Sequence, residues 1–107
     1  MLRSEKGDGL PLMRSYELYF IVYPDADEEE LTAIIDKVTQ TITAHGGQVT
    51  EVNSKGKRKL AYPISKFKEG YDVVMQTQLE FEGIQELERS LKLSEPVIRY
   101  LLVKTDE

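Results

Sequence analysis

Fourteen residues near the middle of the chain carry a large share of its positive charge. The stretch KGKRKLAYPISKFK, residues 55–68, holds six basic residues and no acidic one. Phosphate groups bind lysine and arginine strongly and release condensed counterions when they do. Lysines on an edge strand can also discourage edge-to-edge aggregation, but that purpose needs one or two of them rather than six. The stretch therefore indicates a surface for RNA or another polyanion.

Motifs for catalysis or metal binding are missing from the rest of the sequence. The single histidine, His45, stands before Gly46-Gly47, where a helix-capping role is expected. The acidic run 25–30 lacks the ligand spacing and the central glycine of a calcium loop. The chain has no cysteine, no phosphate-cradling glycine motif and no nucleophile elbow. We therefore expect no enzyme activity, no cofactor and no metal site.

Length and charge limit the class of protein. The 107 residues are enough for a single domain, which we expect over residues 14–107. Residues 1–13 mix charges with glycine and proline and predict a disordered or loosely packed N-terminal extension. No apolar run is long enough to span a membrane, so no membrane partner is expected. The net charge of -5 argues against indiscriminate nucleic-acid binding.

The first predicted strand, residues 15–23, is unusual because both of its faces are apolar. Leu18, Phe20 and Val22 share one face with Tyr16. The other face carries Tyr19, Ile21 and Tyr23. A strand of this kind is typical of the centre of a sheet that is covered on both sides.

The remaining elements follow from periodicity and from chain-breaking residues. A helix begins within the acidic run, where the carboxylates of residues 27–30 lie at the positive end of its dipole; it carries an apolar stripe to Ile42 and ends at 45–47. Residues 48–64 are predicted to form one long strand, or two segments joined by a bend near 54–56. Gly56 would allow a bulge, and Pro63 requires an edge position. A turn over 66–70, a strand over 71–79, a helix over 83–93 and a strand over 97–104 complete the chain.

This order predicts an α+β, ferredoxin-like split βαβ sandwich (βαββαβ). Its four-stranded antiparallel sheet would carry both helices on one face. The other face would be bare, so Tyr19, Ile21 and Tyr23 would form an exposed apolar patch of the kind that marks partner sites. The alternative is that these are surface aromatic and aliphatic residues of no consequence.

The central motif resembles the signature region of a known family. GKRKLAYPI at 56–64, then Lys66 and the tripeptide EGY at 69–71, is similar to ribosomal protein six of the bacterial small subunit. Further similarities agree in order and spacing: RSYE at 14–17, Gly46-Gly47 with Val49, LER at 87–89 and VIRY at 97–100. The resemblance covers about residues 13–104.

The resemblance implies a non-catalytic structural constituent of the small ribosomal subunit, located in the cytoplasm on the ribosome. It implies that the chain is a monomer in isolation and binds the central domain of small-subunit ribosomal RNA together with ribosomal protein eighteen. The RNA-binding residues implied are Arg14, Lys57, Arg58, Lys59, Lys66 and Arg99. The residues implied for the protein partner are Tyr16, Tyr19, Ile21, Tyr23, Tyr62 and Tyr71.

Two other functions are compatible with the same order of elements. An RNA-recognition motif would have a similar first strand, but Asp72 and Val74 stand where its base-stacking aromatics are expected. A ligand-sensing regulatory domain can share the fold, since fold does not fix function. Such a domain would be marked by a glycine-rich or charged small-molecule loop, which the sequence does not contain.

Overall fold

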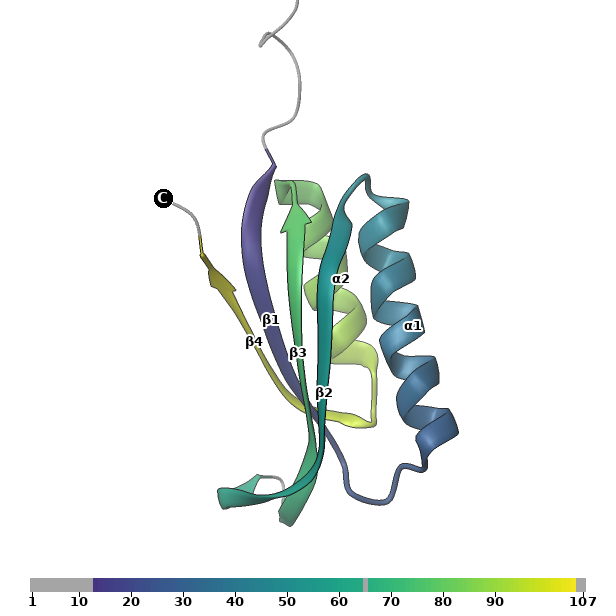
Figure 1. Ribbon diagram of the computed structural model, residues 1–107, viewed down its shortest axis with the longest axis vertical. Helices are drawn as coiled ribbons and strands as arrows, with labels where there is room; N and C mark the ends of the chain where they lie inside the picture. The colour runs from purple at the N-terminus through teal and green to yellow at the C-terminus, as the bar shows by residue number, and fades with distance from the viewer. Residues whose placement is uncertain (1–12, 65, 106–107) are drawn as a thin grey trace, which may run out of the picture.

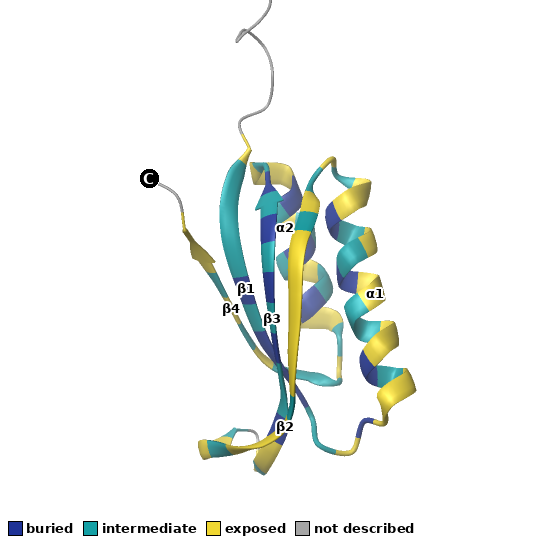
Figure 2. Cartoon of the chain, in the orientation of Figure 1, coloured by how far each residue is buried: buried dark blue, intermediate teal, exposed yellow. Residues whose placement is uncertain are grey.

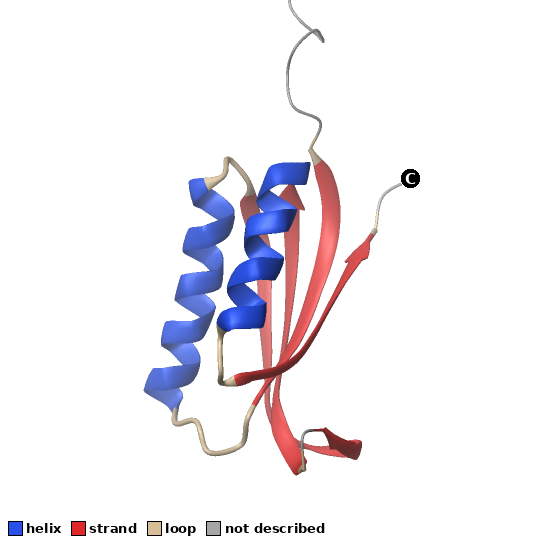
Figure 3. Ribbon diagram, turned by 180° about the vertical axis from the view of Figure 1, so that it is seen from behind, coloured by secondary structure: helices blue, strands red, loops and turns tan. Residues whose placement is uncertain are grey.

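The computed structural model describes residues 13–64 and 66–105. Apart from Met13, the predicted N-terminal extension lies outside the described residues. The elements are β1 (Arg14–Val22), α1 (Glu28–Ala44), β2 (Gln48–Ile64), β3 (Phe67–Leu79), α2 (Phe81–Leu93) and β4 (Val97–Lys104). All strand pairs are antiparallel and their order is β2-β3-β1-β4. Both helices cover one face of the sheet, which confirms the ferredoxin-like prediction (Figure 1 and Figure 3).

The main core lies between the helices and the inner face of the sheet. Leu18, Phe20 and Val22 of β1 are fully buried there, as the alternation of the strand predicts. The predicted stripe of α1 and the inward residues of α2 meet them from the other side, with Ile42 and Leu87 fully buried. Burial of one such side chain contributes about 1.5–3 kcal/mol. The two central strands, β1 and β3, are therefore fixed firmly beneath the helices.

The ends of α1 are set by local signals. The Asp27 carboxylate accepts a hydrogen bond of 2.8 Å from the backbone N–H of Glu30, which caps the first turn. His45 occupies the C-cap and Gly46 follows with φ +79°, a conformation that favours glycine. Both observations confirm the predicted start and stop of this helix.

The hairpin of β2 and β3 agrees with the predictions in all but its turn. β2 is an edge strand, and it bulges at Gly56, where φ is +81° and the register shifts between Ser54 and Lys57. The predicted turn over 66–70 is wrong, because β3 already begins at Phe67. Gly70 lies buried within that strand, where a Cβ atom would come within 2.5 Å of Ile21 Cγ2. This glycine allows a close approach between strands and does not form a turn.

The far end of the hairpin leaves the plane of the sheet. We call residues 55–64 and 66–68 the arm. In Figure 1 the arm bends away from the helices, toward the side on which β4 lies. Arg99 of β4 donates a hydrogen bond of 3.1 Å to the hydroxyl of Tyr62, so the arm reaches from one edge of the sheet to the other. The outer face of the sheet is therefore covered at this end.

Candidate nucleic-acid interface

The six cations of the arm are all exposed: Lys55, Lys57, Arg58, Lys59, Lys66 and Lys68. Strand alternation divides them between the two sides of the hairpin. Lys57 lies opposite Tyr71 and places its ammonium 5.6 Å from the centre of that ring, within the range of a cation–π contact. Arg58 lies on the other side, with its Nε 4.0 Å from Asp72 Oδ2. Figure 2 shows that β2 is exposed along much of its length. The arm therefore presents positive charge to solvent on both sides of the hairpin.

Arg58 approaches a hydrogen-bonded pair of side chains, Tyr19 and Asp72, on the outer face. The Tyr19 hydroxyl donates a hydrogen bond of 3.1 Å to the Asp72 carboxylate that Arg58 also approaches. Burial raises the pKa of the Tyr19 phenol, and the negative charge of Asp72 raises it further. Tyr19 therefore remains protonated and can donate at neutral pH. Half of the Arg58 side chain is still open to solvent, at 55 % exposure, and can meet a phosphate.

The predicted RNA-binding residues do not form a single cluster. Lys57, Arg58, Lys59 and Lys66 belong to the arm, and Arg99 touches it through Tyr62. Arg14 pairs with Leu79 at the opposite end of β1 from Val22. With about 3.3 Å per strand residue, Arg14 lies roughly 26 Å from that end of the strand. The structure therefore brings five of the predicted residues together and separates Arg14 from them.

The tyrosines predicted for the protein partner lie on both sides of the sheet. Tyr16 and Tyr71 pack against the main core on the inner face, and Tyr19 and Tyr62 lie on the outer face. The prediction that Tyr23 shares the outer face is wrong. β1 ends at Val22, and beyond it Tyr23 donates a hydrogen bond of 3.0 Å to Glu30 of α1. Its ring also meets Phe67 edge to face, with the centroids 6.2 Å apart.

The prediction that Ile21 is part of an exposed apolar patch is also wrong. This side chain points to the outer face but is only 3 % exposed. The arm lies over it, and the space between arm and sheet is a cleft of about 240 Å³. The cleft is lined by Tyr19, Ile21, Leu60, Ala61, Tyr62, Ile64, Arg99 and Leu101.

The apolar surface that is open on the outer face includes the predicted Tyr62 and two residues of β4 that were not predicted. Leu101 and Val103 of β4 are 52 % and 43 % exposed, and Tyr62 is 53 % exposed. The alternation of Arg99, Leu101 and Val103 along β4 could have revealed this strip, since alternate residues of one strand share a face.

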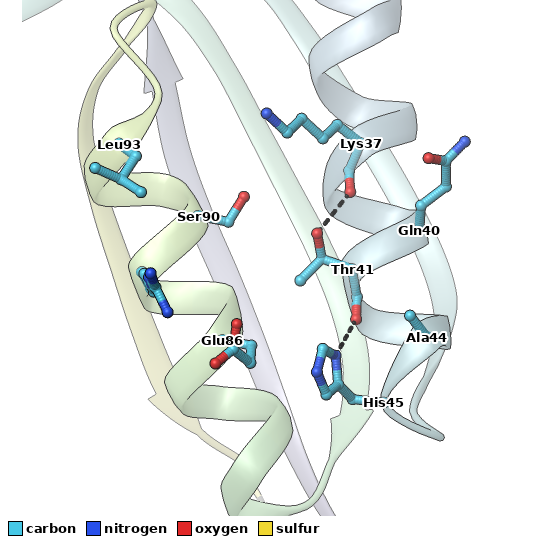
Figure 4. A pocket seen from close by; sticks show the side chains of 9 residues that line it. Lys37, Gln40, Thr41, Ala44, His45, Glu86, Ser90 and Leu93 are labelled. Carbon is cyan, nitrogen blue, oxygen red and sulfur yellow. Dashed lines mark hydrogen bonds between the residues drawn. The ribbon is translucent and has the colours of Figure 1, made fainter.

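A second hollow, of about 480 Å³, lies between the helices (Figure 4). Lys37 of α1 and His45, the C-cap of that helix, face Glu86 and Ser90 of α2 across it. His45 donates from Nδ1 to the Thr41 carbonyl at 2.9 Å, which fits the predicted capping role. The lining mixes both signs of charge, with Lys37 and Arg89 against Glu86.

Metal ligands and membrane-spanning helices are both missing from residues 13–64 and 66–105. No group of three or more histidine or acidic side chains in this part of the chain could hold a metal ion. Neither of the two helices described there is long and apolar enough to cross a membrane.

Comparison with known proteins gives a consistent result. Residues 15–104 match the family model described as Ribosomal protein S6. The chain is 48 % identical over 99 residues to the small ribosomal subunit protein bS6 of Moorella thermoacetica, covering 89 % of this chain and 97 % of the relative. It is 45 % identical over 95 residues to bS6 of Thermoanaerobacter pseudethanolicus, covering 89 % and 100 %.

A solved structure agrees with these relatives. The 30S ribosomal protein S6 from Thermotoga maritima superposes with a TM-score of 0.83 at 32 % identity, covering 88 % of this chain and 89 % of that one. All three relatives are named as ribosomal proteins, which confirms the expectation that the chain is not an enzyme. The chain belongs to the ribosomal protein S6 family.

Proposed function

We propose that this member of the S6 family is a structural constituent of the small ribosomal subunit that binds ribosomal RNA jointly with ribosomal protein eighteen. The RNA would be the central domain of the small-subunit molecule. This role implies a cytoplasmic location on the ribosome. The observation that carries the proposal is the arm, where six exposed cations stand without one acidic residue among them.

The arm suits RNA because its cations are accessible and largely unpaired. Among the described residues, only Arg58 of this group approaches a carboxylate, at 4.0 Å from Asp72. An exposed pair of this kind contributes little and gives way easily to a stronger anion. Each phosphate that such a cation neutralises releases counterions, which is the main source of affinity for nucleic acid. Arg99, beside Tyr62, extends this basic surface onto β4.

The rest of the chain suits a basic protein partner. Outside the arm, acidic residues outnumber basic ones, so that the whole chain has a net charge of -5. Opposite net charges speed association and disfavour wrong partners. The outer face adds an apolar strip that runs from Tyr62 of the arm to Leu101 and Val103 of β4. A partner seated there would lie beside the RNA-binding surface and could extend it.

An RNA-recognition motif remains the less suitable alternative. Asp72 and Val74 occupy the outer face of β3, paired with Ile21 and Tyr19 of β1. A motif of that kind stacks bases on aromatic side chains at these central positions. Aspartate and valine offer no such platform, so charge rather than stacking on β3 should dominate RNA binding.

Sedimentation of a bacterial lysate tests the proposal directly. The tagged chain is expressed at a low level, and the lysate is separated on a sucrose gradient in mild salt. We expect the chain to sediment with small ribosomal subunits and to leave them as the salt concentration is raised. A chain that stays at the top of the gradient in mild salt, while a tagged resident small-subunit protein sediments normally, would contradict the proposal.

A further inference from the structure

Asp72 carries a carboxylate that the proposed function leaves without a role. It belongs to β3, and its side chain is only 14 % exposed. Carboxylates are rarely buried to this extent unless they have partners. Asp72 has two: the Tyr19 hydroxyl donates a hydrogen bond of 3.1 Å to one carboxylate oxygen, and the Nε atom of Arg58 lies 4.0 Å from the other. One oxygen is therefore held within the sheet, and the other is turned toward the arm.

The contact with Asp72 leaves the end of the Arg58 guanidinium open. The nitrogen that approaches the carboxylate is Nε. The terminal nitrogens carry the remaining N–H groups, and these can bind a phosphate through two parallel hydrogen bonds. The Arg58 side chain is 55 % exposed, so solvent and ligands can reach it. A phosphate can therefore bind at the end of the guanidinium while Asp72 stays beside Nε.

Orientation is worth more to an arginine than to the neighbouring lysines. An ammonium group binds a phosphate as a point charge from almost any direction, whereas a guanidinium must present its planar fork. A fork that already points outward loses less conformational freedom when the phosphate binds. The negative charge of Asp72 repels the phosphate, but this repulsion is weakened by the guanidinium between them and by salt, with a screening length of about 8 Å. The gain in orientation should therefore exceed the repulsion.

We propose that Asp72 is a positioning residue of the RNA site, which approaches Arg58 at Nε and thereby aims the terminal nitrogens of the guanidinium at a backbone phosphate of ribosomal RNA. Tyr19 supports this role by holding the carboxylate. The inference rests on the proposed function, under which RNA binds the arm. It gives Arg58 an oriented phosphate contact and leaves the lysines of the arm as unoriented charges.

The sign of one substitution tests the inference. Asp72→Asn removes the charge but keeps the shape of the side chain and an oxygen for the Tyr19 hydroxyl. Glu69→Gln is the matched control, because it removes the same charge from an exposed site on the same strand. Both substitutions are also made in the Arg58→Gln background. Filter binding to a central-domain RNA fragment measures the affinity of each heterodimer with ribosomal protein eighteen, and thermal unfolding checks that each variant is folded.

We expect Asp72→Asn to weaken RNA binding about threefold or more, although it makes the protein less negative. Glu69→Gln should bind as tightly as the wild type or more tightly, because it removes only repulsion. In the Arg58→Gln background, Asp72→Asn should no longer weaken binding. Should Asp72→Asn fail to fold, the same comparison is made with Tyr19→Phe, which loosens the carboxylate without removing its charge.

Unchanged or tighter RNA binding by Asp72→Asn would overturn the inference, because the carboxylate would then only repel the phosphates. An equal loss of affinity with and without Arg58 would also overturn it, since Asp72 would then act by another route. Both results leave RNA binding by the wild-type protein intact. A wild-type heterodimer that does not bind the fragment would instead refute the proposed function.

Discussion

Ile21 shows how one residue can belong to a core on the face of a sheet that has no helices. Its side chain points to the outer face, yet it is 3 % exposed. It is not part of the main core cluster between the sheet and the helices. The absence of a Cβ at Gly70 lets the two strands approach closely at Ile21. Ile21 is therefore the centre of a second, small core that holds the arm against the sheet.

Replacing Ile21 by lysine should destabilise the fold. The variant removes a buried apolar side chain and places an ammonium group where water hardly reaches, so we expect unfolding free energy to fall by about 3 kcal/mol. Val103→Lys is the matched control, because it puts the same group on the same face at a site that is 43 % exposed. Its cost should be within about 0.5 kcal/mol. Urea denaturation measures both, and equal costs would show that the arm does not cover Ile21 in solution.

The arm is the element whose geometry gives the molecule its candidate site. It departs from the sheet just beyond Gly56, where φ is +81° and the ladder to β3 shifts register. The Tyr62–Arg99 bond then holds its far end over β4. No atom lies within 4 Å of a Cβ built on Gly56, so only backbone conformation restricts this position. The bulge therefore works as the bend that turns a flat hairpin into a curled one.

Two substitutions at Gly56 separate backbone strain from steric contact. Asparagine tolerates a left-handed conformation better than alanine does. We expect Gly56→Ala to lower unfolding free energy by about 1–2 kcal/mol, the cost of a left-handed residue with a Cβ, and Gly56→Asn to lower it less. Urea denaturation of both variants gives the order. If alanine costs no more than asparagine, the bulge has relaxed to another conformation and the bend does not depend on glycine.

Local sequence patterns were sufficient for most elements but not for the arm. Alternation and chain breakers predicted β4 with the bounds that the structure has, and they predicted β2 as either one long strand or two segments over the same residues. The apolar stripes predicted which helix faces are buried. Gly70 led to a wrong prediction, because a glycine needed for close approach looks the same in a sequence as one needed for a turn. The curl depends on contacts such as Tyr62–Arg99, which joins residues 37 positions apart.

The positive charge of the candidate site was predicted from the sequence, but only part of its apolar surface was. The basic stretch is contiguous, so its cations could be found without knowing the fold. Tyr23 was misplaced because β1 ends one residue earlier than predicted, and alternation no longer holds beyond that point. The cleft could not be predicted from the sequence, because its walls come from β1, β2 and β4, which meet only when the arm curls.

At the scale of the whole molecule, positive charge gathers on the arm, which bends away from the helices, and negative charge gathers on α1 (Figure 1). The arm is purely basic, whereas α1 carries Glu28, Glu29, Glu30 and Asp36 against a single Lys37. An RNA that approached the helices would meet repulsion, and one that approached the arm would meet cations. This polarity orients the chain on a polyanion even though the net charge of the chain is negative. It also leaves the acidic remainder available to a basic partner.

The salt dependence of RNA affinity tests the role of the arm most directly. We compare the wild-type heterodimer with the variant Lys57→Gln, Arg58→Gln, Lys59→Gln on a central-domain fragment of small-subunit ribosomal RNA. The control variant Lys37→Gln, Arg89→Gln, Lys92→Gln removes the same charge from the helices. We expect the arm variant to bind more weakly and its slope of log affinity against log salt to flatten by roughly 0.7–0.9 for each phosphate that the arm no longer neutralises. The control should keep the wild-type slope. Equal slopes for all three proteins would contradict the account, because the arm cations would then only protect a sheet edge.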